Sequence, residues 1–448
     1  MLKNININSF VKEKELSILF KKLYPICSSI TGKGFNDRLK IINNLVKLNI
    51  KKVKSGTKVL DWIVPNVWNI EDGYLLKGKK KIIDFKKHSL HVINYSSPIN
   101  KTLSFQELDS HLYTLPKIPN AIPYVHTYYD RNWGFALKHS EYMKMSRKTK
   151  YKAVIKSKIK PGYLYYSDNL IKGKSKKEIL IYAYLCHPQL ANHEISGPLL
   201  WTYLFKILKE TGPHNYSYRF VLCPENIGAA TFLHFNKKKV KNIKAGYIVN
   251  CVGNGNIVTL KKSREGNTLA DKAALNILNF LKHPKKIVDF FPDGSDERQF
   301  CSPGFNMPIA LVMRKMFGTF KEYHNSLDDE KFINFKTIIE TLKIYYEILL
   351  TIENNFLPLG RVQYGTPQLS RSKIDLYPKQ MDHQRNPKNS DVKLMMEILN
   401  LSDGKKDILD ICNEKKYKLI DHINLYDKLL KSGYIKKHES TSNLRRPS

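Results

Sequence analysis

The sequence predicts an α/β fold in which helices sandwich a mostly parallel sheet. After about Gly173 a strand-length apolar run, a polar loop and a helix-like run follow one another repeatedly. Repetition of this kind is typical of a parallel sheet that is buried on both faces. Helical sequence lies near the N-terminus, and a β-rich stretch separates it from the repeated strand-loop-helix region. The predicted strands of the sheet are residues 179–185, 218–222, 246–251 and 308–313.

The first 53 residues are predicted to start the α/β domain with two helices. Residues 13–53 alternate apolar and charged positions at helical spacing, and the interrupting residues 24–32 contain proline, serine and glycine. Such a break between two periodic segments indicates a turn.

A β-rich region follows, with short runs of strand period separated by proline and glycine. Because helices precede it and the parallel sheet follows it, residues 54–164 are predicted to be a domain inserted into an α/β domain formed by residues 1–53 and 165–356. Its tryptophans, Trp62, Trp68 and Trp133, are interpreted as core residues rather than a sugar-binding platform. The predicted strands are residues 58–63, 80–85, 90–93, 151–155 and 162–166.

The C-terminal part is predicted to be a small separate domain. A helix at 334–355 closes the α/β domain, and the polar, proline-bearing residues 357–388 are predicted to be a linker. Residues 389–440 then have the layout of a winged helix. Helix-like runs at 392–399, 406–412 and 418–430 precede Gly433-Tyr434-Ile435, where a hairpin would begin.

The charge balance is strongly basic, with 75 Lys and Arg against 40 Asp and Glu. These lysines are scattered over the whole chain, and no dense basic cluster carries the regular aromatic residues of a nucleic-acid platform. In the candidate recognition segment 418–431, Asp421 and Asp427 interrupt the few basic residues. The sequence therefore argues against nucleic acid as a partner, and we interpret the charge as a solvated surface.

The cysteines and the apolar runs predict a cytoplasmic protein without a membrane span. Six cysteines are spread over the chain without a CxxC pair, which indicates reduced thiols. Residues 1–20 lack the apolar core of a signal peptide, and no eighteen apolar residues run together. The 42% of hydrophobic residues is enough to form a substantial core.

Potential metal ligands follow the predicted strands at the points where the strands end. In an open α/β sheet, ligands bind at the carboxyl ends of the strands, so these side chains are expected to meet at one sheet edge. They are His187 and His193 after the first strand, Glu225 after the second, Asn250 and Asn254 around the end of the third, and His324 after the fourth.

Imidazole and carboxylate groups together form a ligand set that zinc accepts. A catalytic zinc site uses three protein ligands and a water molecule whose pKa the metal lowers, with a carboxylate nearby as base. The sequence therefore predicts a metal site where His187, Glu225 and His324 meet at the strand ends, with His193 in the same loop as His187. Alternatively, Glu225 caps the helix that follows it.

The loop before the fourth strand is rich in charged residues. Asp293 is interpreted as a turn former, because Gly294 follows it. Asp296, Glu297 and Arg298 either form a structural ion-pair cluster or contribute to the site as supporting or substrate-contacting residues.

Eight motifs, spread from about residue 15 to 435, resemble one family. The chain is similar to bacterial polysaccharide-biosynthesis proteins with an aminopeptidase-like domain, which are related to zinc aminopeptidases and glutaminyl cyclases. This resemblance implies a phosphorylase- or hydrolase-like α/β sandwich, an inserted β-rich domain and a C-terminal winged helix. The motifs are SSITGKG (28–34), VKSGTKVLDWIVPNVWNI (53–70), LHVINYSSPINKTLSFQEL (90–108), PYVHTYYDRNWGFAL (123–137), CHPQLANHEISG (186–197), PENIG (224–228), GSDERQF (294–300) and EYHNSLD (322–328).

The resemblance also implies a metal site with one zinc ion. The family usually has aspartate where this chain has His193, and that carboxylate bridges two zincs in classical aminopeptidases. A neutral imidazole has a single lone pair and cannot bridge in this way. The resemblance thus implies one zinc bound by His187, His193 and His324, with Glu225 as base or fourth ligand. Acids of the wider superfamily are also replaced at Asn226, Asn250 and Asn254.

Three hypotheses of function follow. The first is a zinc-dependent aminopeptidase-like hydrolase that acts on an amide of a small or peptide-like molecule, for example an aminoacylated or amino-sugar substrate in surface polysaccharide biosynthesis. The second is a catalytically degenerate binding or scaffold protein, since acids are missing from the site. The third, less favoured, is a winged-helix regulator that binds nucleic acid. A homo-oligomer is compatible with all three.

Overall fold

The computed structural model describes residues 5–371 and 390–438. The chain packs as two compact units. The main unit consists of Ile5–Ala270 and His283–Lys343, and the smaller unit contains Asp271–Lys282 and Ile344–Ser448. Most of the predicted linker, residues 372–388, lies outside the described residues, as do the ends of the predicted winged-helix range at 389 and 439–440. The domain boundaries predicted from the sequence stay a prediction.

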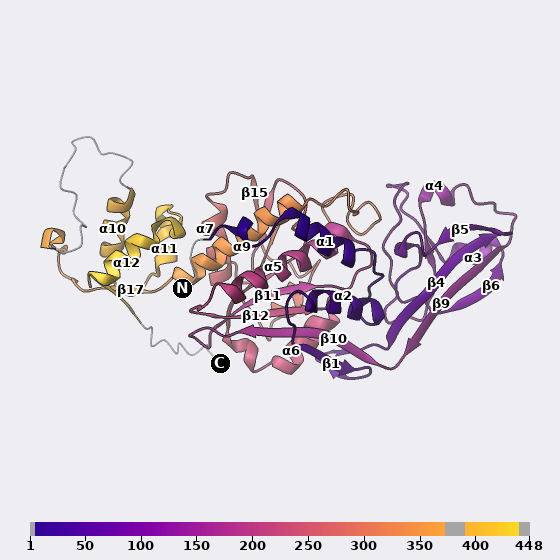
Figure 1. The fold of residues 1–448 in the computed structure, drawn as a ribbon, viewed down its shortest axis with the longest axis horizontal. Coiled ribbons are helices and arrows are strands. Elements are labelled where there is room, and N and C mark those ends of the chain that lie inside the picture. The colour runs from indigo at the N-terminus through magenta and orange to yellow at the C-terminus, as the bar shows by residue number, and fades with distance from the viewer. Residues whose placement is uncertain (1–4, 372–389, 439–448) are drawn as a thin grey trace. The chain divides into compact units, whose positions relative to one another are not determined.

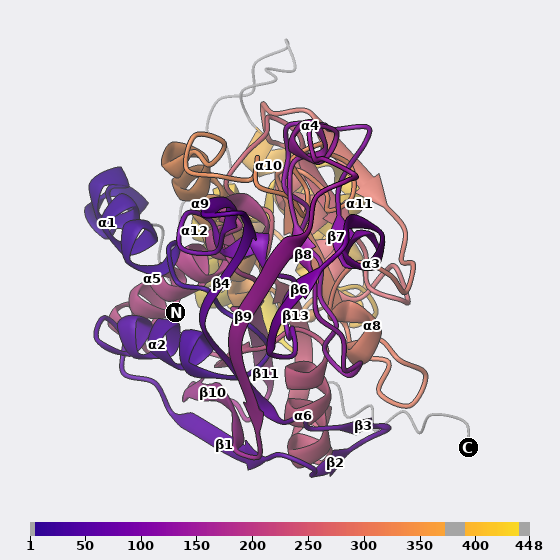
Figure 2. The ribbon, with the colours of Figure 1, turned by 90° about the vertical axis from the view of Figure 1, so that its right-hand side faces the viewer.

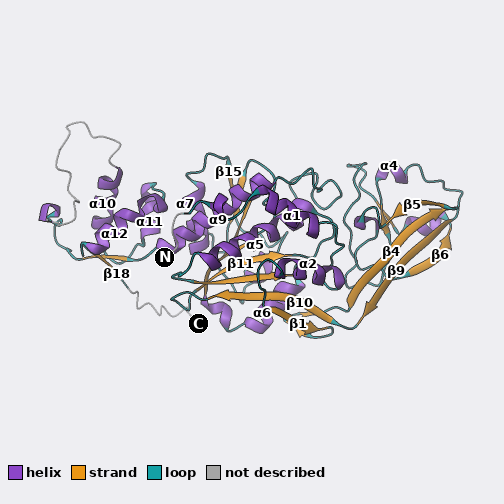
Figure 3. Cartoon of the chain, in the orientation of Figure 1, coloured by secondary structure: helices purple, strands orange, loops and turns teal. Residues whose placement is uncertain are grey.

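An eight-stranded mixed sheet forms the centre of the main unit (Figures 1 and 3). Four of its seven strand pairings are parallel, and the central strands β12, β11, β13 and β16 run parallel to one another. The predicted mostly parallel sheet is thereby confirmed. In sheet order the strands are β1 (Ile50–Lys54), β10 (Tyr163–Ile171), β12 (Ser217–Cys223), β11 (Glu178–Tyr184), β13 (Ile243–Ile248), β16 (Ile309–Met313), β14 (Val258–Lys261) and β15 (Lys285–Val288).

The central strands are buried on both faces because helices cover the sheet on both sides. Every residue of β11 and β12 is buried, as the nearly continuous apolar sequence of β11 predicts. Helices α1, α2 and α5 lie on one side of the sheet and α6 on the other (Figures 1 and 2). The helices of this unit are α1 (Glu13–Leu23), α2 (Lys33–Asn43), α3 (Phe105–Asp109), α4 (His139–Tyr142), α5 (Ser196–Glu210), α6 (Ile227–Asn236) and α8 (Glu297–Phe300).

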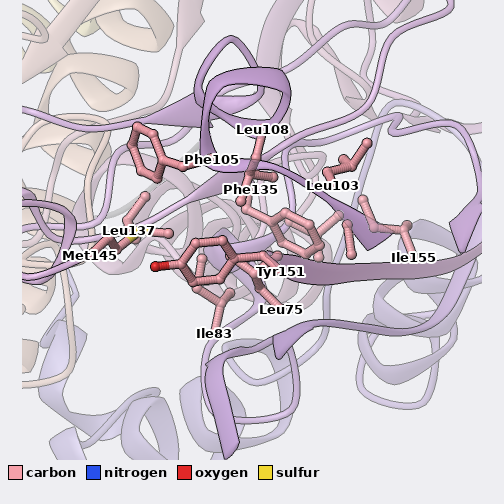
Figure 4. Close-up of a cluster of buried hydrophobic side chains, with 12 residues drawn as sticks. Leu75, Ile83, Leu103, Phe105, Leu108, Phe135, Leu137, Met145, Tyr151 and Ile155 are labelled. Atoms are coloured by element: carbon pink, nitrogen blue, oxygen red, sulfur yellow. The ribbon is translucent and has the colours of Figure 1, made fainter. Parts of the chain in front are cut away.

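A second, antiparallel sheet lies between β1 and β10 in the sequence. Its order is β5-β4-β9-β6, and buried side chains of these strands pack with α3 around Tyr151 and Phe135 (Figure 4). Trp68 is buried and donates from Nε1 to the carbonyl of Ser96, and Trp133 packs on the same core, as predicted for core tryptophans. The strands are β4 (Val67–Lys77), β5 (Lys80–Asp84), β6 (Ile99–Leu103), β9 (Tyr151–Lys160), and the short pair β7 (Leu112–Tyr113) and β8 (Phe135–Ala136).

Two strand predictions in this region were wrong, and a third predicted strand is present but belongs to the other sheet. Residues 58–63 form a tight hairpin, β2 (Lys58–Val59) and β3 (Trp62–Ile63), because Leu60 adopts a positive φ of 54° and reverses the chain. Residues 89–91 form a 3-10 turn, which His88 caps by accepting from the Leu90 N–H. Residues 162–166 start β10, which pairs with β1 and β12 and so belongs to the large sheet.

The smaller unit contains the three predicted C-terminal helices. They are α10 (Ser390–Leu401), α11 (Ile408–Lys415) and α12 (Ile423–Lys431). Strand β18 (Ile435–Lys437) pairs antiparallel with β17 (Pro358–Gly360), so the strand at 435 uses a partner from before the helices. The unit also contains part of α7 (Leu269–Leu278) and the C-terminal part of α9 (Phe335–Asn354).

All six cysteines are free thiols. Across residues 5–371 and 390–438, none of the helices combines the length and the apolar character that a membrane crossing requires.

Candidate metal centre

Two loops bring three histidines together at the edge of the large sheet. His187 follows β11, and His193 lies in a single π-helical turn, Ala191–Ile195, that continues directly into α5. His324 lies in the loop after β16 with a positive φ of 57°. One nitrogen of each ring lies within 4.8 Å of a nitrogen of the others. The structure therefore brings His187, His193 and His324 together, although these residues lie up to 137 positions apart in the sequence (324 − 187).

The imidazoles of His193 and His324 are kept neutral. His193 Nε2 and His324 Nε2 face each other at 3.1 Å. Burial lowers the pKa of both imidazoles well below the usual value, and the neighbouring histidines lower it further. Neutral imidazoles keep the lone pair that a metal ion needs.

His187 is oriented by a buried carboxylate. Its backbone N–H and its Nδ1 donate to the two oxygens of Glu194, at 2.9 and 2.7 Å. Arg38 compensates this carboxylate at 3.7 Å and donates to the carbonyl of His187 at 2.7 Å. With Nδ1 occupied as donor, the Nε2 lone pair of His187 is left for a ligand. Sequence reasoning missed Glu194 and Arg38, although Glu194 directly follows His193.

The π-helical turn is held by Asp328. Its carboxylate accepts from the backbone N–H groups of Asn192 at 2.6 Å and His193 at 2.9 Å. Its own carbonyl accepts from the N–H of Ala191 at 2.9 Å. Because Asp328 is four residues after His324, the same loop carries one histidine and positions another. Asp328 is part of the sequence motif at 322–328, but its position in that motif does not reveal that it binds the turn containing His193.

Glu225 lies beside the histidines rather than at a helix cap. Its Oε2 is 3.6 Å from His187 Nε2, and the N-cap of α6 is Asn226. Burial, followed by the nearby carboxylate of Asp296, raises the pKa of Glu225 well above its usual value. A raised pKa makes the carboxylate a stronger base than an exposed glutamate.

The carboxylates of the charged loop before β16 have two different kinds of partner. Asp296 accepts from the backbone N–H of Asn226 at 2.6 Å and from the hydroxyl of Tyr182. Burial raises the pKa of Asp296 to about 7. Glu297 instead forms a fully buried ion pair with Lys261, so the ion-pair interpretation fits this residue.

The two asparagines expected near the third strand have structural partners. Asn250 donates to the hydroxyl of Ser295 at 3.1 Å, and Asn254 donates to the carbonyl of Phe332. Neither of them lines the cavity described below, whereas Asp293 and Arg298 do. Both asparagines therefore support loops next to the site.

A cavity of about 530 Å³ opens onto His187, His324 and Glu225. Much of its wall comes from residues 124–130, which lie in the predicted inserted domain. His126 and Tyr128 stack at 4.0 Å, and burial lowers the pKa of His126 to about 4. Trp62 also lines the cavity, so its interpretation as a core residue was wrong. It lies in the β2–β3 hairpin, which the sequence had merged into one strand.

Hydrogen bonds join this wall to the His324 loop. The N–H of Tyr124 donates to the carbonyl of His324 at 2.8 Å, and the Ile122 N–H donates to Ser326 Oγ at 2.9 Å. The Tyr124 ring packs edge-on against both His187 and His324. The cavity wall and the histidines are therefore one continuous structure.

The donor set fits a zinc ion. Two nitrogens bound tetrahedrally to zinc lie about 3.3 Å apart, close to the observed separation of the His193 and His324 nitrogens. The three imidazoles are buried or nearly so, and one carries a carboxylate partner on its other nitrogen, as metal-binding histidines do.

The sheet order and this edge site define the class of protein: an α/β protein with an aminopeptidase-like fold. A zinc aminopeptidase from Bacillus subtilis has a similar structure, with a TM-score of 0.55 and 11% identity, covering 78% of this chain and 95% of that one. An aminopeptidase from Aneurinibacillus sp. strain AM-1 has a TM-score of 0.50 and 11% identity, covering 77% and 95%. At this level of identity the likeness shows the fold alone.

The chain belongs to the family described as a domain of unknown function, DUF4910, whose model matches residues 18–355. Residues 358–437 match a winged helix-turn-helix family. A relative from Clostridium acetobutylicum, provisionally named a polysaccharide biosynthesis protein with an aminopeptidase-like domain, is 39% identical over 411 residues, or 90% of this chain and 93% of the relative. A crystal structure from that organism, provisionally described as a peptidase, has a TM-score of 0.86 and 37% identity, covering 96% and 98%. The predicted resemblance and winged helix are confirmed.

Proposed function

We propose that this protein is a hydrolase that uses one zinc ion to cleave an amide. The observation that carries the proposal is the convergence of three histidines beside Glu225 at the edge of the sheet. The substrate would be a small or peptide-like molecule, for example an aminoacylated or amino-sugar amide. The name of the Clostridium relative supports a place in polysaccharide biosynthesis.

His187, His193 and His324 would hold the ion, which when bound would act as a Lewis acid and lower the pKa of water. Glu225 Oε2 accepts the proton of the attacking water and returns it to the departing amine nitrogen. Its raised pKa suits both steps, because the carboxyl group can hold the proton between them. The aromatic wall around Tyr124 excludes bulk water from the reacting amide.

The neighbouring side chains favour one ion over two. His193 supplies an imidazole where classical sites have a bridging carboxylate. Asn226 accepts two hydrogen bonds from Arg298 at its Oδ1, so this amide oxygen is already occupied. Asn250 is likewise a neutral amide. Neutral groups at these positions supply no further charge to balance a second ion.

The variant Glu225→Gln tests the role of the base. It keeps the size of the side chain and removes its ability to accept a proton. On a panel of aminoacyl p-nitroanilides with free and acetylated amino groups, kcat is expected to fall by roughly 10²- to 10⁴-fold while zinc content is unchanged. Activity equal to the parent in this variant would refute the assignment.

A binding or scaffold role is the second candidate, favoured by the asparagines at positions 226, 250 and 254. It predicts zinc-independent binding and no turnover of any amide in the panel. We also propose a cytoplasmic location, because all six cysteines are free thiols.

A further inference from the structure

Arg298 is a charged residue on the cavity wall that the proposed chemistry does not use. It lies on α8, is exposed, and lines the cavity beside Glu225 and Asn226. Its Nε and Nη2 both donate to Asn226 Oδ1, at 3.0 and 2.8 Å. A guanidinium has five N–H donors, so three remain for another partner.

The group that holds Arg298 is itself fixed. Asn226 has a positive φ of 58°, and its backbone N–H donates to Asp296 Oδ1 at 2.6 Å. Asp296 is fully buried and its other oxygen accepts from the hydroxyl of Tyr182, which lies on the central strand β11. A chain of hydrogen bonds therefore runs from the sheet to the guanidinium and orients it before any ligand binds.

The partner of Arg298 is an amide, which orients the guanidinium without neutralising it. Within the described ranges, Arg298 has no carboxylate in ion-pair distance. Arg219 shows the contrasting arrangement, since Glu178 and Asp168 each bind it at 2.6 Å. Burial raises the pKa of Glu225, Asp296 and Glu297, and the charge of Arg298 partly offsets this rise, but none of these carboxyl groups forms an ion pair with it. An oriented arginine of this kind is suited to bidentate binding of a carboxylate or phosphate group.

Arg298 is also distinctive within the cavity. Over the described residues that line it, the wall contains this one arginine and no lysine, while Asp130, Glu225 and Asp293 are acidic. Arg298 is therefore the cationic side chain that an anionic group would meet in the cavity. It is hydrogen-bonded to Asn226, the residue that follows Glu225.

We propose that Arg298 binds an anionic group of the substrate, a carboxylate or a phosphate, next to the amide that is cleaved. This inference rests on the proposed function, because Glu225 marks where the amide reacts. Arg298 is then the specificity-determining residue, and Asn226 is a positioning residue that aims it. The substrates are accordingly acidic amides.

Two pairs of amides test the proposal on the full chain. Glutamyl and glutaminyl p-nitroanilide differ in a carboxylate, and phosphoseryl and seryl p-nitroanilide differ in a phosphate. The quantity measured is the ratio of kcat/KM for the acidic member to that for the neutral member. We compare the parent with Arg298→Ala, Arg298→Lys and Asn226→Ala, and use Arg264→Ala, the loss of an exposed arginine outside the cavity lining, as control.

The parent is expected to prefer the acidic member of at least one pair. Arg298→Ala should lower that ratio by roughly 10- to 100-fold, mainly through KM, since a hydrogen-bonded charge partner is lost. Arg298→Lys should restore part of the preference, Asn226→Ala should lower it less, and the control should leave it unchanged. The pair that responds distinguishes carboxylate from phosphate. An unchanged ratio in Arg298→Ala would overturn the proposal.

Calorimetric titration separates this inference from the proposed function. Glutamate, glutamine, O-phosphoserine and serine are titrated into the same proteins. Binding of an anionic compound that Arg298→Ala abolishes, without hydrolysis of any amide, would support the anion site and reject the hydrolase. Hydrolysis without acidic preference would reject the anion site alone. No binding and no preference would overturn the anion site.

Discussion

Glu194 accepts hydrogen bonds from both the backbone N–H and the Nδ1 of His187, at 2.9 and 2.7 Å. One buried carboxylate thus fixes the position of the loop and the tautomer of the ring. The free nitrogen of His187 is directed at Glu225, which lies 3.6 Å away. The geometry of the candidate site therefore depends on Glu194, which is not one of the three histidines proposed to hold the ion.

We expect Glu194→Gln to weaken zinc binding by roughly 10- to 100-fold, because the amide neither fixes the tautomer nor raises the basicity of His187. Competition with a chelating dye measures the affinity. Glu210→Gln, at the exposed end of α5, is the control and should bind zinc like the parent. Equal affinity in both variants would show that Glu194 does not support the site.

Arg38→Met should destabilise the fold by roughly 3–5 kcal/mol, because it leaves the buried carboxylate of Glu194 without its cation. Arg38 is fully buried and donates to the carbonyls of Leu23, Ile26 and His187. Urea unfolding measures the loss. Arg264→Met removes an exposed arginine and should change the free energy of unfolding by no more than about 0.5 kcal/mol.

Asp296 should make stability fall as pH rises between about 4 and 7. Burial raises its folded-state pKa to about 7, above the unfolded value, so the folded protein holds a proton that the unfolded chain has lost. Relative to Asp296→Asn, the parent should lose roughly 3–5 kcal/mol over this range and then level off, since a pKa difference of one is worth about 1.4 kcal/mol.

The measurement is the free energy of unfolding of both proteins in urea at a series of pH values. A difference between parent and Asp296→Asn that is constant from pH 4 to 7 would contradict the raised pKa. A difference that grows in favour of the parent as pH rises would mean that folding lowers the pKa of Asp296 instead of raising it.

Tyr124→Ala should lower both stability and zinc affinity. The ring packs against His187 and His324, and losing a large buried aromatic side chain costs roughly 3–5 kcal/mol. Tyr124→Phe keeps the ring and loses only the hydroxyl contact with Tyr128, so about 1 kcal/mol is expected. Thermal unfolding and dye competition distinguish the two. Equal effects of both substitutions would mean that the ring does not hold the histidines.

The sequence predicted the fold and the histidine triad because both follow local rules. The apolar run at 179–185 has the length of a buried strand, and ligands at carboxyl strand ends share one sheet edge, which brings His187 and His324 together. Glu225 was a candidate for the same reason, because it follows the second predicted strand. Strand pairing was harder to predict from the sequence. Residues 162–166 have strand period, but only the pairing of their strand β10 with β12 shows that they join the large sheet.

The parts that were missed depend on contacts between distant residues. Arg38 reaches Glu194 across 156 positions (194 − 38), and Tyr124 meets His324 across 200 (324 − 124). Neither pairing leaves a periodic signal in the sequence. Asn250 and Asn254 follow the third strand as expected, yet their amides bond to Ser295 and to the carbonyl of Phe332. Position after a strand predicts proximity to a site but not the direction of a side chain.

The zinc content per chain tests the central claim most directly. Elemental analysis is made on protein purified without a histidine tag, for the parent and for His187→Ala, with Arg264→Ala as control. About one zinc per chain in the parent and the control, and none in His187→Ala, is the predicted result. Absence of metal from the parent after incubation with zinc, or equal zinc in the parent and His187→Ala, would contradict a metal centre built on these histidines.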